Sequence, residues 1–378
     1  MNVTLVNMTL DPVRGGGTAV RTRELALALA RRGAAVTVLT SRDGDWRRTA
    51  AELPGVRVLG VPVVGGRFRV PRGGLGAVAR AVASADVVMA LNHWTLLNAL
   101  AWRQARRAAI PFVVCPAGAL GYQGRSLAAK RLYNRLVGRR MVAGAAACVA
   151  IAASELEELA AYGVAPAAVT VIPNGVGASA APDAEASRRA LGLSQPMMLF
   201  LGRLAPIKGP DLLVEAFLDR QAELDGWQLA LAGPDDGLEA ALRRRVRSAG
   251  AEDRVRFLGF VAGSRKQQAL AAAELVVIPS RQEAMSIVVL EAGAAGKPVL
   301  LTDRCGLPEV AEAGGGWVVP ATREAIGEGL VEAVRDRERL AACGRRWRRR
   351  VLDRYSWDRA AERHLALFRR LTAGREAA

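Results

Sequence analysis

The sequence predicts an α/β fold class with two parallel sheets, because short apolar segments alternate with helical patterns along its 378 residues. The apolar segments, such as those at 275–278 and 299–302, predict strands. The helical patterns between them suit the crossovers that connect parallel strands. A chain of this length exceeds most single domains, so two domains are expected.

The first predicted domain covers residues 1–176. It begins with a strand at 3–6, a Gly-rich loop at 11–17 and a helix at 19–32, which Gly33 ends. Its further strands are predicted at 36–39, 56–59, 87–91, 112–115, 148–151 and 169–172.

Residues 177–195 are rich in Ala, Ser, Pro and Gly, and we predict a linker there. The second predicted domain covers residues 196–354, and a helical tail at 355–378 follows it. The strands of this domain are predicted at 198–201, 228–232, 255–258, 275–278, 299–302 and 317–319. Two Rossmann-like domains that face a common cleft are therefore expected.

The composition narrows the class of protein. Hydrophobic residues make up 51% of the chain, which is ample for two cores, and no apolar run approaches the roughly 20 residues of a membrane-spanning helix. The segment Met1-Asn2-Val3 leads into a strand without a charged region, so no signal peptide is expected. The cysteines are widely spaced and predict buried thiols in a reducing compartment rather than a metal site: Cys115, Cys148, Cys305 and Cys343.

The net charge of +17 suggests an anionic partner. Nucleic acid, an anionic membrane surface and phosphorylated substrates all fit it. The alternative is compositional, since Ala, Arg and Gly are abundant throughout the chain. Nucleic acid is the weakest of these hypotheses, because aromatic content is only 5% and no nucleic-acid-binding module is recognisable.

Two carboxylates in the second half, Glu283 and Glu291, flank a predicted junction between a loop and a helix. The junction follows the strand at 275–278, and the amides of a helix N-terminus at the carboxyl end of a strand suit a phosphate. Glu283 precedes that turn and can accept hydrogen bonds from ligand hydroxyls. Glu291 lies about two turns along the helix, so both carboxylates can point the same way. This arrangement predicts a ligand with a phosphate and hydroxyls.

A second loop places cations beside a glycine. Gly202 follows the strand at 198–201 and lets backbone approach a ligand closely, while Arg203 and Lys208 suit charge-assisted bonds to a diphosphate. The spacing of a P-loop is absent. Taken alone, these residues also fit a solvated basic loop.

The motifs of this chain, taken in order, resemble one enzyme family along nearly its whole length. They are Gly15-Gly16-Gly17, Val171-Ile-Pro-Asn-Gly-Val176, Gly202-Arg203, Lys208-Gly209, Ala232-Gly-Pro234, Val255-Arg-Phe-Leu-Gly259, Glu283-x7-Glu291, Gly296-Lys-Pro-Val299 and Gly306-Leu-Pro-Glu309. In this order and spacing the sequence resembles the family 4 retaining glycosyltransferases, which use nucleotide sugars and have the GT-B fold. The resemblance implies that the tail beginning at Ser356-Trp357 returns to the N-terminal domain.

The resemblance also implies a role for each candidate residue. Arg203 and Lys208 would bind the donor diphosphate and stabilise the charge that builds on the departing nucleotide. Glu283 would hold the hydroxyls of the donor sugar, and Glu291 those of the ribose. The remaining expected contacts are made by backbone: the amides of Met285, Ser286 and Ile287 to the distal phosphate, Gly202 to the donor, and Gly16 and Gly17 to the reacting centre. The donor would be a UDP- or GDP-linked hexose or hexosamine, with no metal and no cofactor.

The chain departs from the family at Ala117. Many members carry a His in a Pro-His-Gly run after the fifth strand of the N-terminal domain, where this chain has Pro116-Ala117-Gly118. Ala117 can neither transfer a proton nor accept a hydrogen bond. His93, after the preceding strand, is the candidate catalytic substitute, and a packed or surface His is the alternative. Asp43-Gly-Asp45 resembles a metal-binding D-x-D run, but a turn is the better interpretation.

A basic amphipathic segment at 125–141 suits contact with anionic lipid head groups through Lys130, Arg131 and Arg135. The alternative is an ordinary helix whose apolar side packs on the sheet. We therefore expect a cytoplasmic enzyme, peripheral on the inner face of the cell membrane, that glycosylates a surface polysaccharide or a lipid-linked glycan. The alternatives are a catalytically silent sugar-nucleotide-binding protein and an enzyme that modifies the nucleotide sugar itself.

Overall fold

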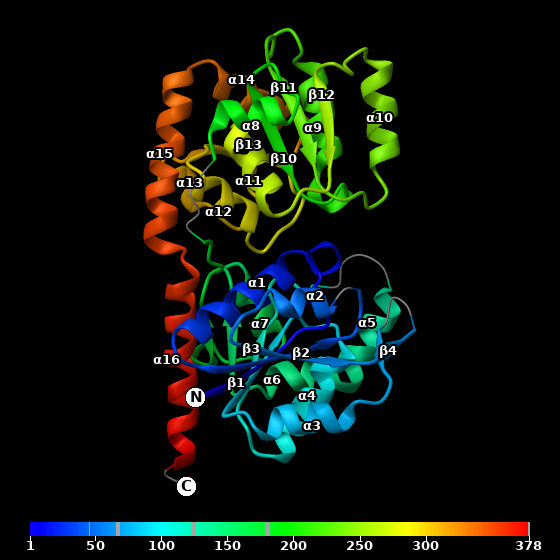
Figure 1. Cartoon of the computed structure of the whole chain (residues 1–378), viewed down its shortest axis with the longest axis vertical. Coiled ribbons are helices and arrows are strands. Elements are labelled where there is room, and N and C mark those ends of the chain that lie inside the picture. The colour runs from blue at the N-terminus through cyan, green and yellow to red at the C-terminus, as the bar shows by residue number, and fades with distance from the viewer. Residues whose placement is uncertain (45, 66–68, 122–125, 178–181, 377–378) are drawn as a thin grey trace. The chain divides into compact units, whose positions relative to one another are not determined.

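The computed structural model describes residues 1–44, 46–65, 69–121, 126–177 and 182–376. It divides the chain into two compact units, each built on its own parallel sheet (Figure 1). Unit 1 contains Met1–Gly175 and Trp357–Ala378, and unit 2 contains Val176–Ser356. The predicted α/β class with two parallel sheets is confirmed.

The sheet of unit 1 has seven strands in its described part, in the order β3-β2-β1-β6-β7-β8-β9. Their bounds are β1 (Asn2–Val6), β2 (Ala35–Ser41), β3 (Val56–Val61), β6 (Val87–Leu91), β7 (Phe112–Cys115), β8 (Ala147–Ala150) and β9 (Val169–Val171). In the parallel register, Val6 lies beside Leu39 of β2 and Ala90 of β6. The strand order reverses between β1 and β6, and ligands bind parallel sheets at such a point.

Helices cover both faces of this sheet. They are α1 (Pro12–Arg31), α2 (Trp46–Ala51), α3 (Leu75–Ala83), α4 (Leu96–Arg107), α5 (Leu127–Tyr133), the π-helix η2 (Asn134–Gly138), α6 (Arg139–Ala143), α7 (Glu155–Ala161), the 3₁₀ helix η3 (Pro166–Ala168) and α16 (Trp357–Glu376). Val88 and Ala90 of β6 pack in one core with α3 and α4. Val87 and Met89 alternate with them and are equally buried, so they face the other side. Helix α16 packs beside α1 (Figure 1).

Unit 1 differs from the sequence prediction in two places. The segment before Gly17 is not an open loop, because Asp11 caps a helical turn by accepting from the amides of Val13 and Arg14. Gly16, with φ 53° and ψ −140°, then kinks α1. A short antiparallel hairpin of β4 (Val63–Val64) and β5 (Val70–Pro71) was not predicted.

Unit 2 repeats the architecture with six strands in its described part, in the order β12-β11-β10-β13-β14-β15. The strands are β10 (Met197–Leu201), β11 (Gln228–Ala232), β12 (Val255–Gly259), β13 (Ala273–Ile278), β14 (Val299–Thr302) and β15 (Gly316–Val319). The helices are α8 (Ala184–Ala190), η4 (Pro206–Lys208), α9 (Pro210–Asp219), α10 (Glu239–Ser248), α11 (Gly263–Ala272), α12 (Ile287–Ala294), α13 (Glu309–Glu312), α14 (Arg323–Val334) and α15 (Arg337–Arg354). The strand order reverses between β10 and β13.

The structure also bears on the predicted linker, the cysteines and the predicted absence of a membrane-spanning helix. Helix α8 lies inside the segment predicted as a linker, where Asp183 caps it by accepting from the amide of Ala186. All four cysteines are buried and free, as predicted. Within the described residues, no helix is both long and apolar enough to cross a membrane.

Candidate functional site

The predicted donor-binding residues of unit 2 follow two neighbouring strands, β10 and β13. These strands pair in parallel, with Leu199 opposite Val276, so their carboxyl ends lie at the same edge of the sheet. The loop after β10 carries Gly202, Arg203 and Lys208, and the loop after β13 leads into α12. Both loops therefore meet at the switch point of the sheet, where doubly wound proteins bind ligands.

Backbone contacts anchor the first of these loops. The amide of Gly202 donates to the carbonyl of Ala232 at 2.9 Å. Gly233 has φ 151°, and a Cβ there would lie 1.8 Å from the Gly202 carbonyl oxygen, so the close approach requires glycine. Arg203 lies at the edge of this loop, with Nη1 2.6 Å from Asp236 Oδ2, and the two side chains are 44% and 53% exposed. The Arg203 guanidinium is thus accessible to a ligand.

The two loops are joined to each other through backbone. The amide of Arg281 donates to the carbonyl of Ile207 at 2.9 Å. Gly209 adopts φ 68°, and a Cβ there would lie 2.0 Å from the carbonyl oxygen of Pro279. Only glycine permits this left-handed turn at such close range. These backbone contacts hold Lys208, in the loop after β10, next to the loop after β13.

A cation and a carboxylate meet where the loops join. Lys208 Nζ lies 2.9 Å from Glu283 Oε1, and the side chains are 25% and 12% exposed. Ser280 Oγ donates to the same oxygen at 2.5 Å, and the Glu283 amide donates to the carbonyl of Arg304 at 2.8 Å. Partial burial strengthens charge interactions at this position. Chemically, the pair offers an ammonium to a phosphate and a carboxylate to hydroxyl groups.

The N-terminus of α12 is open at this same loop. Ser286 is its N-cap residue, but its side chain makes no capping hydrogen bond. The amide of Ile287, the first helical residue, has no acceptor within the helix, because the first turn never does. The Ser286 amide instead donates to the carbonyl of Cys305 at 3.3 Å, so this one of the predicted phosphate ligands already has an acceptor in the chain. Met285 and Ser286 are both buried in the loop.

Glu291 has a different cation from Glu283. Its Oε1 lies 2.6 Å from Nζ of Lys266 on α11, and the side chains are 15% and 31% exposed. Each predicted carboxylate of the site therefore has its own lysine. Sequence reasoning missed Lys266, because a single lysine on a polar helix carries no signal of its own.

The two glycines predicted for the reacting centre, Gly16 and Gly17, follow β1 in unit 1. A Cβ at Gly16 would meet no atom within 4 Å, so its positive φ, rather than crowding, accounts for glycine there. His93 follows β6, the neighbour of β1. The structure thus brings these candidates to the switch point of the first sheet.

His93 nevertheless has the environment of a packed residue. It is 0% exposed, and its Nε2 lies 2.7 Å from Asn134 Oδ1. The rings of Trp94, Tyr133 and Tyr162 surround it edge-on, with centroid distances of 4.5, 5.4 and 5.4 Å. Burial lowers the pKa of His93 from 6.5 to about 4, against the opposing effect of the Asn134 hydrogen bond. The sequence left two alternatives for His93, a catalytic residue and a packed or surface residue. This geometry is that of a packed residue.

Ala117 occupies a constrained turn after β7. Its φ is 51°, an unusual value for a residue with a side chain. The next amide, of Gly118, donates to Glu155 Oε1 at 2.6 Å, and the amide of Ile151 donates to Oε2 at 2.6 Å. The buried Glu155 carboxylate thus holds the turn in which many family members carry His.

The basic segment of unit 1 exposes its leucines. Leu127, Leu132 and Leu136 are 39%, 56% and 64% exposed, so the interpretation that they pack on the sheet is wrong. Val137 does pack against the core, and Asn134, Gly138 and Met141 are the buried positions among the described residues of this segment. Lys130 Nζ lies 4.9 Å from the centre of the Trp94 ring.

Two residues of the sequence interpretation, Arg125 of the basic segment and Asp45 of the D-x-D run, lie outside the described residues. The other carboxylate of that run, Asp43, is ion-paired with Arg14 and Arg69.

Comparisons with known proteins agree with this architecture. Residues 16–175 match the family model described as "Glycosyl transferase 4-like domain", and residues 183–350 match "Glycosyl transferases group 1". The D-inositol 3-phosphate glycosyltransferase of Kineococcus radiotolerans is 32% identical over 402 residues, covering 96% of this chain and 92% of that protein. The enzyme of the same name from Actinosynnema mirum is 31% identical, with coverages of 93% and 92%.

Solved structures share the whole fold. Anabaena Alr3699/HepE in complex with UDP and glucose superposes with a TM-score of 0.81 at 20% identity, covering 97% of this chain and 99% of that chain. Sucrose-phosphate synthase from Thermosynechococcus elongatus superposes with a TM-score of 0.79 at 22% identity, covering 99% and 100%. The fold is thus of the GT-B class. The chain belongs to the group 1, family 4 glycosyltransferases.

Proposed function

We propose that the protein transfers a hexose or hexosamine from a UDP- or GDP-linked donor, with retention of anomeric configuration. The observation that carries this proposal is the contact between Lys208 and Glu283 at the switch point of unit 2. A diphosphate needs cations that neutralise the charge gained by the departing nucleotide, and Lys208 and Arg203 supply them. A sugar needs acceptors for its hydroxyls, and Glu283 supplies one.

Glu291 completes the proposed donor site. In this proposal its carboxylate, which lies beside Lys266, holds the ribose hydroxyls, and the first-turn amides of α12 bind the distal phosphate. Charge neutralisation by side chains and a helix N-terminus makes transfer possible without a metal ion or a cofactor. HepE, one of the structural neighbours, is described in complex with UDP-glucose, which supports a nucleotide-sugar donor.

The proposed acceptor is a surface polysaccharide or a lipid-linked glycan at the inner face of the cell membrane. The exposed leucines of the segment 127–136 support this location, because Lys130, Arg131 and Arg135 lie among them. A smaller phosphorylated polyol is a second candidate acceptor, favoured by the names of the curated relatives. Transfer assays with a glycan primer and with an inositol phosphate would separate the two acceptors.

Substitution at the donor site tests the proposed transfer. We expect Lys208→Ala and Glu283→Ala each to lower the rate of transfer by about 10²-fold or more, the effect of removing one preorganised group that stabilises developing charge. Arg247→Ala is the matched control, because Arg247 forms an exposed ion pair with Glu252 on the same unit. Full activity of both site variants, with folding verified by circular dichroism, would contradict the assignment.

A second candidate function is that of a sugar-nucleotide-binding protein without transferase activity. It is suggested by Ala117, which stands where many family members carry a His. In the proposed reaction the departing phosphate takes the acceptor proton, so no side-chain base is required. Calorimetry with a panel of UDP-, GDP- and ADP-sugars would identify the donor. If the donor binds but is neither transferred nor slowly hydrolysed, the result would support a sugar-nucleotide-binding protein without transferase activity. Conversion of the donor sugar without acceptor would instead indicate an enzyme that modifies nucleotide sugars.

Membrane contact has a separate test. We expect the protein to cosediment with anionic vesicles and not with neutral ones. Neutralising Lys130, Arg131 and Arg135 together should remove that preference, because each cation contributes about 1 kcal/mol near an anionic surface. Failure to bind either kind of vesicle would contradict the proposed location while leaving the transfer reaction unaffected.

A further inference from the structure

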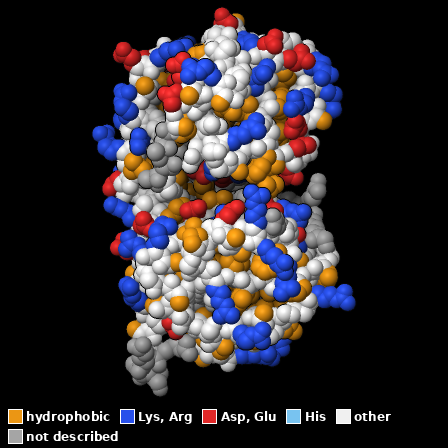
Figure 2. Space-filling view, viewed as in Figure 1, with side chains coloured by type: hydrophobic (Ala, Val, Ile, Leu, Met, Phe, Trp, Pro, Cys, Tyr) orange, Lys and Arg blue, Asp and Glu red, His pale blue; other side chains and the backbone are white. Residues whose placement is uncertain are grey.

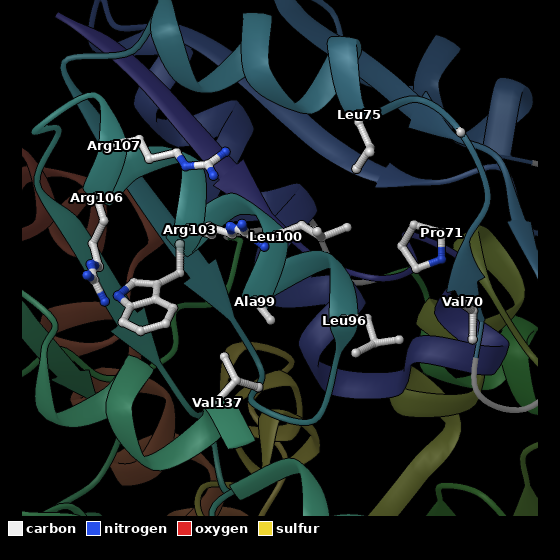
Figure 3. Close-up of a pocket in the computed structure, with 12 residues that line it drawn as sticks. Val70, Pro71, Leu75, Leu96, Ala99, Leu100, Arg103, Arg106, Arg107 and Val137 are labelled. Carbon is white, nitrogen blue, oxygen red and sulfur yellow. The ribbon is translucent and has the colours of Figure 1, made fainter. Parts of the chain in front are cut away.

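An apolar groove runs along α4 in unit 1, and none of the residues assigned to glycosyl transfer lines it. Its volume is about 660 Å³, within the range typical of small-molecule sites. Helices α3 and α4, the β5 strand and η2 supply its walls (Figure 3). The groove therefore requires an explanation beyond the donor site.

The lining of the groove separates into an apolar end and a basic end. Leu96 and Leu100 lie in the N-terminal half of α4, and Arg103, Arg106 and Arg107 lie in its C-terminal half. Their spacing places them on one side of the helix. In Figure 3 the arginines gather at one end of the view and Leu96, Leu75 and Val70 at the other. A ligand lying along α4 would therefore contact apolar side chains at the N-terminal end of the helix and positively charged side chains at its C-terminal end.

The apolar end is open to solvent. Leu75 is 54% exposed, Val70 is 40% exposed and Leu96 is 38% exposed. Val137 of η2 also lines the groove. Contiguous exposed apolar side chains of this kind mark a binding surface more often than isolated ones do. Figure 2 shows hydrophobic and basic side chains side by side on the face over α3 and α4.

The basic end lacks counter-charges from the described residues of the chain. In the part of the chain that the structure describes, no carboxylate lies within ion-pair distance of Arg103, Arg106 or Arg107. Arg106 stacks over Trp102, with the guanidinium carbon 5.0 Å from the ring centre. The position at the C-terminus of α4 lets the helix dipole stabilise these cations without neutralising them. The three arginines thus remain available to an anion.

We propose that this groove binds a membrane lipid that carries a phosphate, with its hydrocarbon chain between α3 and α4 and its phosphate on Arg103, Arg106 and Arg107. An anionic amphiphile is the occupant because its hydrocarbon chain and its negative charge match the two ends of the groove. Free phosphate would leave the apolar end uncovered, and a neutral lipid would leave the arginines without a partner. The site is independent of glycosyl transfer, so its failure would not affect the proposed function.

Calorimetry on the full chain tests the site with soluble probes held below their micelle concentrations. Decyl phosphate is the matching probe, decyltrimethylammonium reverses the charge, and inorganic phosphate lacks the chain. We expect binding of decyl phosphate alone, with affinity rising roughly tenfold for each two CH₂ groups added to the chain. Equal binding of the cationic probe or of inorganic phosphate would overturn the proposal, as would the absence of decyl phosphate binding.

Matched variants locate the site. Leu75→Glu and Leu96→Glu each place a carboxylate at the first residue of a helix, which the helix dipole tolerates, and each should weaken decyl phosphate binding at least tenfold. Leu352→Glu changes a leucine that is 41% exposed in unit 2 and should leave binding unchanged. Arg103→Gln should weaken binding of decyl phosphate about tenfold. Unchanged affinity in folded Leu75→Glu and Leu96→Glu proteins would show that the probe binds elsewhere and would overturn the proposal.

Discussion

Acid should destabilise unit 1 through its buried histidines, and His364 of α16 allows this to be measured. His364 is 0% exposed, and its Nδ1 donates to the carbonyl of Ala360 at 2.7 Å. Burial lowers its pKa from 6.5 to about 3, and the charge of Arg21 lowers it further. Because the folded pKa is depressed, its contribution to stability is fully present above pH 6.5 and is lost as the pH falls toward the folded value.

The loss of folding stability follows from the pKa of His364 in the unfolded chain, 6.5, and in the folded protein, about 3. At pH 5.0 the unfolded histidine is almost fully protonated, whereas the folded one remains neutral. Linkage at 1.36 kcal/mol per pH unit then gives a loss of about 2 kcal/mol between pH 7.5 and pH 5.0 from His364 alone. His93, with its pKa of about 4, should lose a similar amount over the same range.

Hydrogen exchange is the suitable assay, because it reports on unit 1 within the whole chain. The opening free energy of the β1 and β6 amides, corrected for the pH dependence of intrinsic exchange, would be compared between wild type and His364→Leu. The wild type should lose about 2 kcal/mol more than the variant on going to pH 5.0. Glu155, whose pKa burial raises, responds in the opposite direction, but it does so equally in both proteins. Equal losses in the two proteins would refute the reasoning.

Three further predictions concern unit 2. Gly306→Ala, at φ 67°, would place a Cβ 1.7 Å from the carbonyl of Ala284; we expect a shifted donor loop and a higher KM for the nucleotide sugar, measured by steady-state kinetics. Trp347→Ala removes a fully buried ring whose Nε1 donates to the carbonyl of Val289 at 2.9 Å, and chemical denaturation should show a loss of about 3–5 kcal/mol. Burial raises the pKa of Cys305 to about 12, so iodoacetamide at pH 8 should leave it unmodified in the folded protein, as peptide mass spectrometry would show.

The central strands of both sheets could be predicted from the sequence with nearly correct bounds. Strands β11 and β14 begin and end where predicted, because strands buried on both faces are continuous apolar runs. The two loops of the proposed donor site could be located from the sequence, since glycine, cations and carboxylates follow such runs directly. The hairpin of β4 and β5 was missed, because two-residue strands are too short for any pattern.

Tertiary environment was harder to predict than local structure. Periodicity identifies residues that share a helix face but not what covers that face, so the exposure of Leu132 and Leu136 did not follow from the pattern. The partner of Glu291 lies 25 residues earlier in the chain, on another helix. His93 is enclosed by rings from separate elements, and the spacing of one histidine in the chain indicates nothing about them.

The path of the chain has a consequence for synthesis on the ribosome. Unit 2 is one continuous stretch, whereas unit 1 includes α16, the last 20 described residues, whose Phe368 is fully buried. Domains usually form in the order in which they are translated. Here completion runs in the opposite order: unit 2 can finish folding before α16 is synthesised, while unit 1 stays incomplete until that helix has been made. A ribosome that stops just before Trp357 would therefore leave the earlier-made unit incomplete.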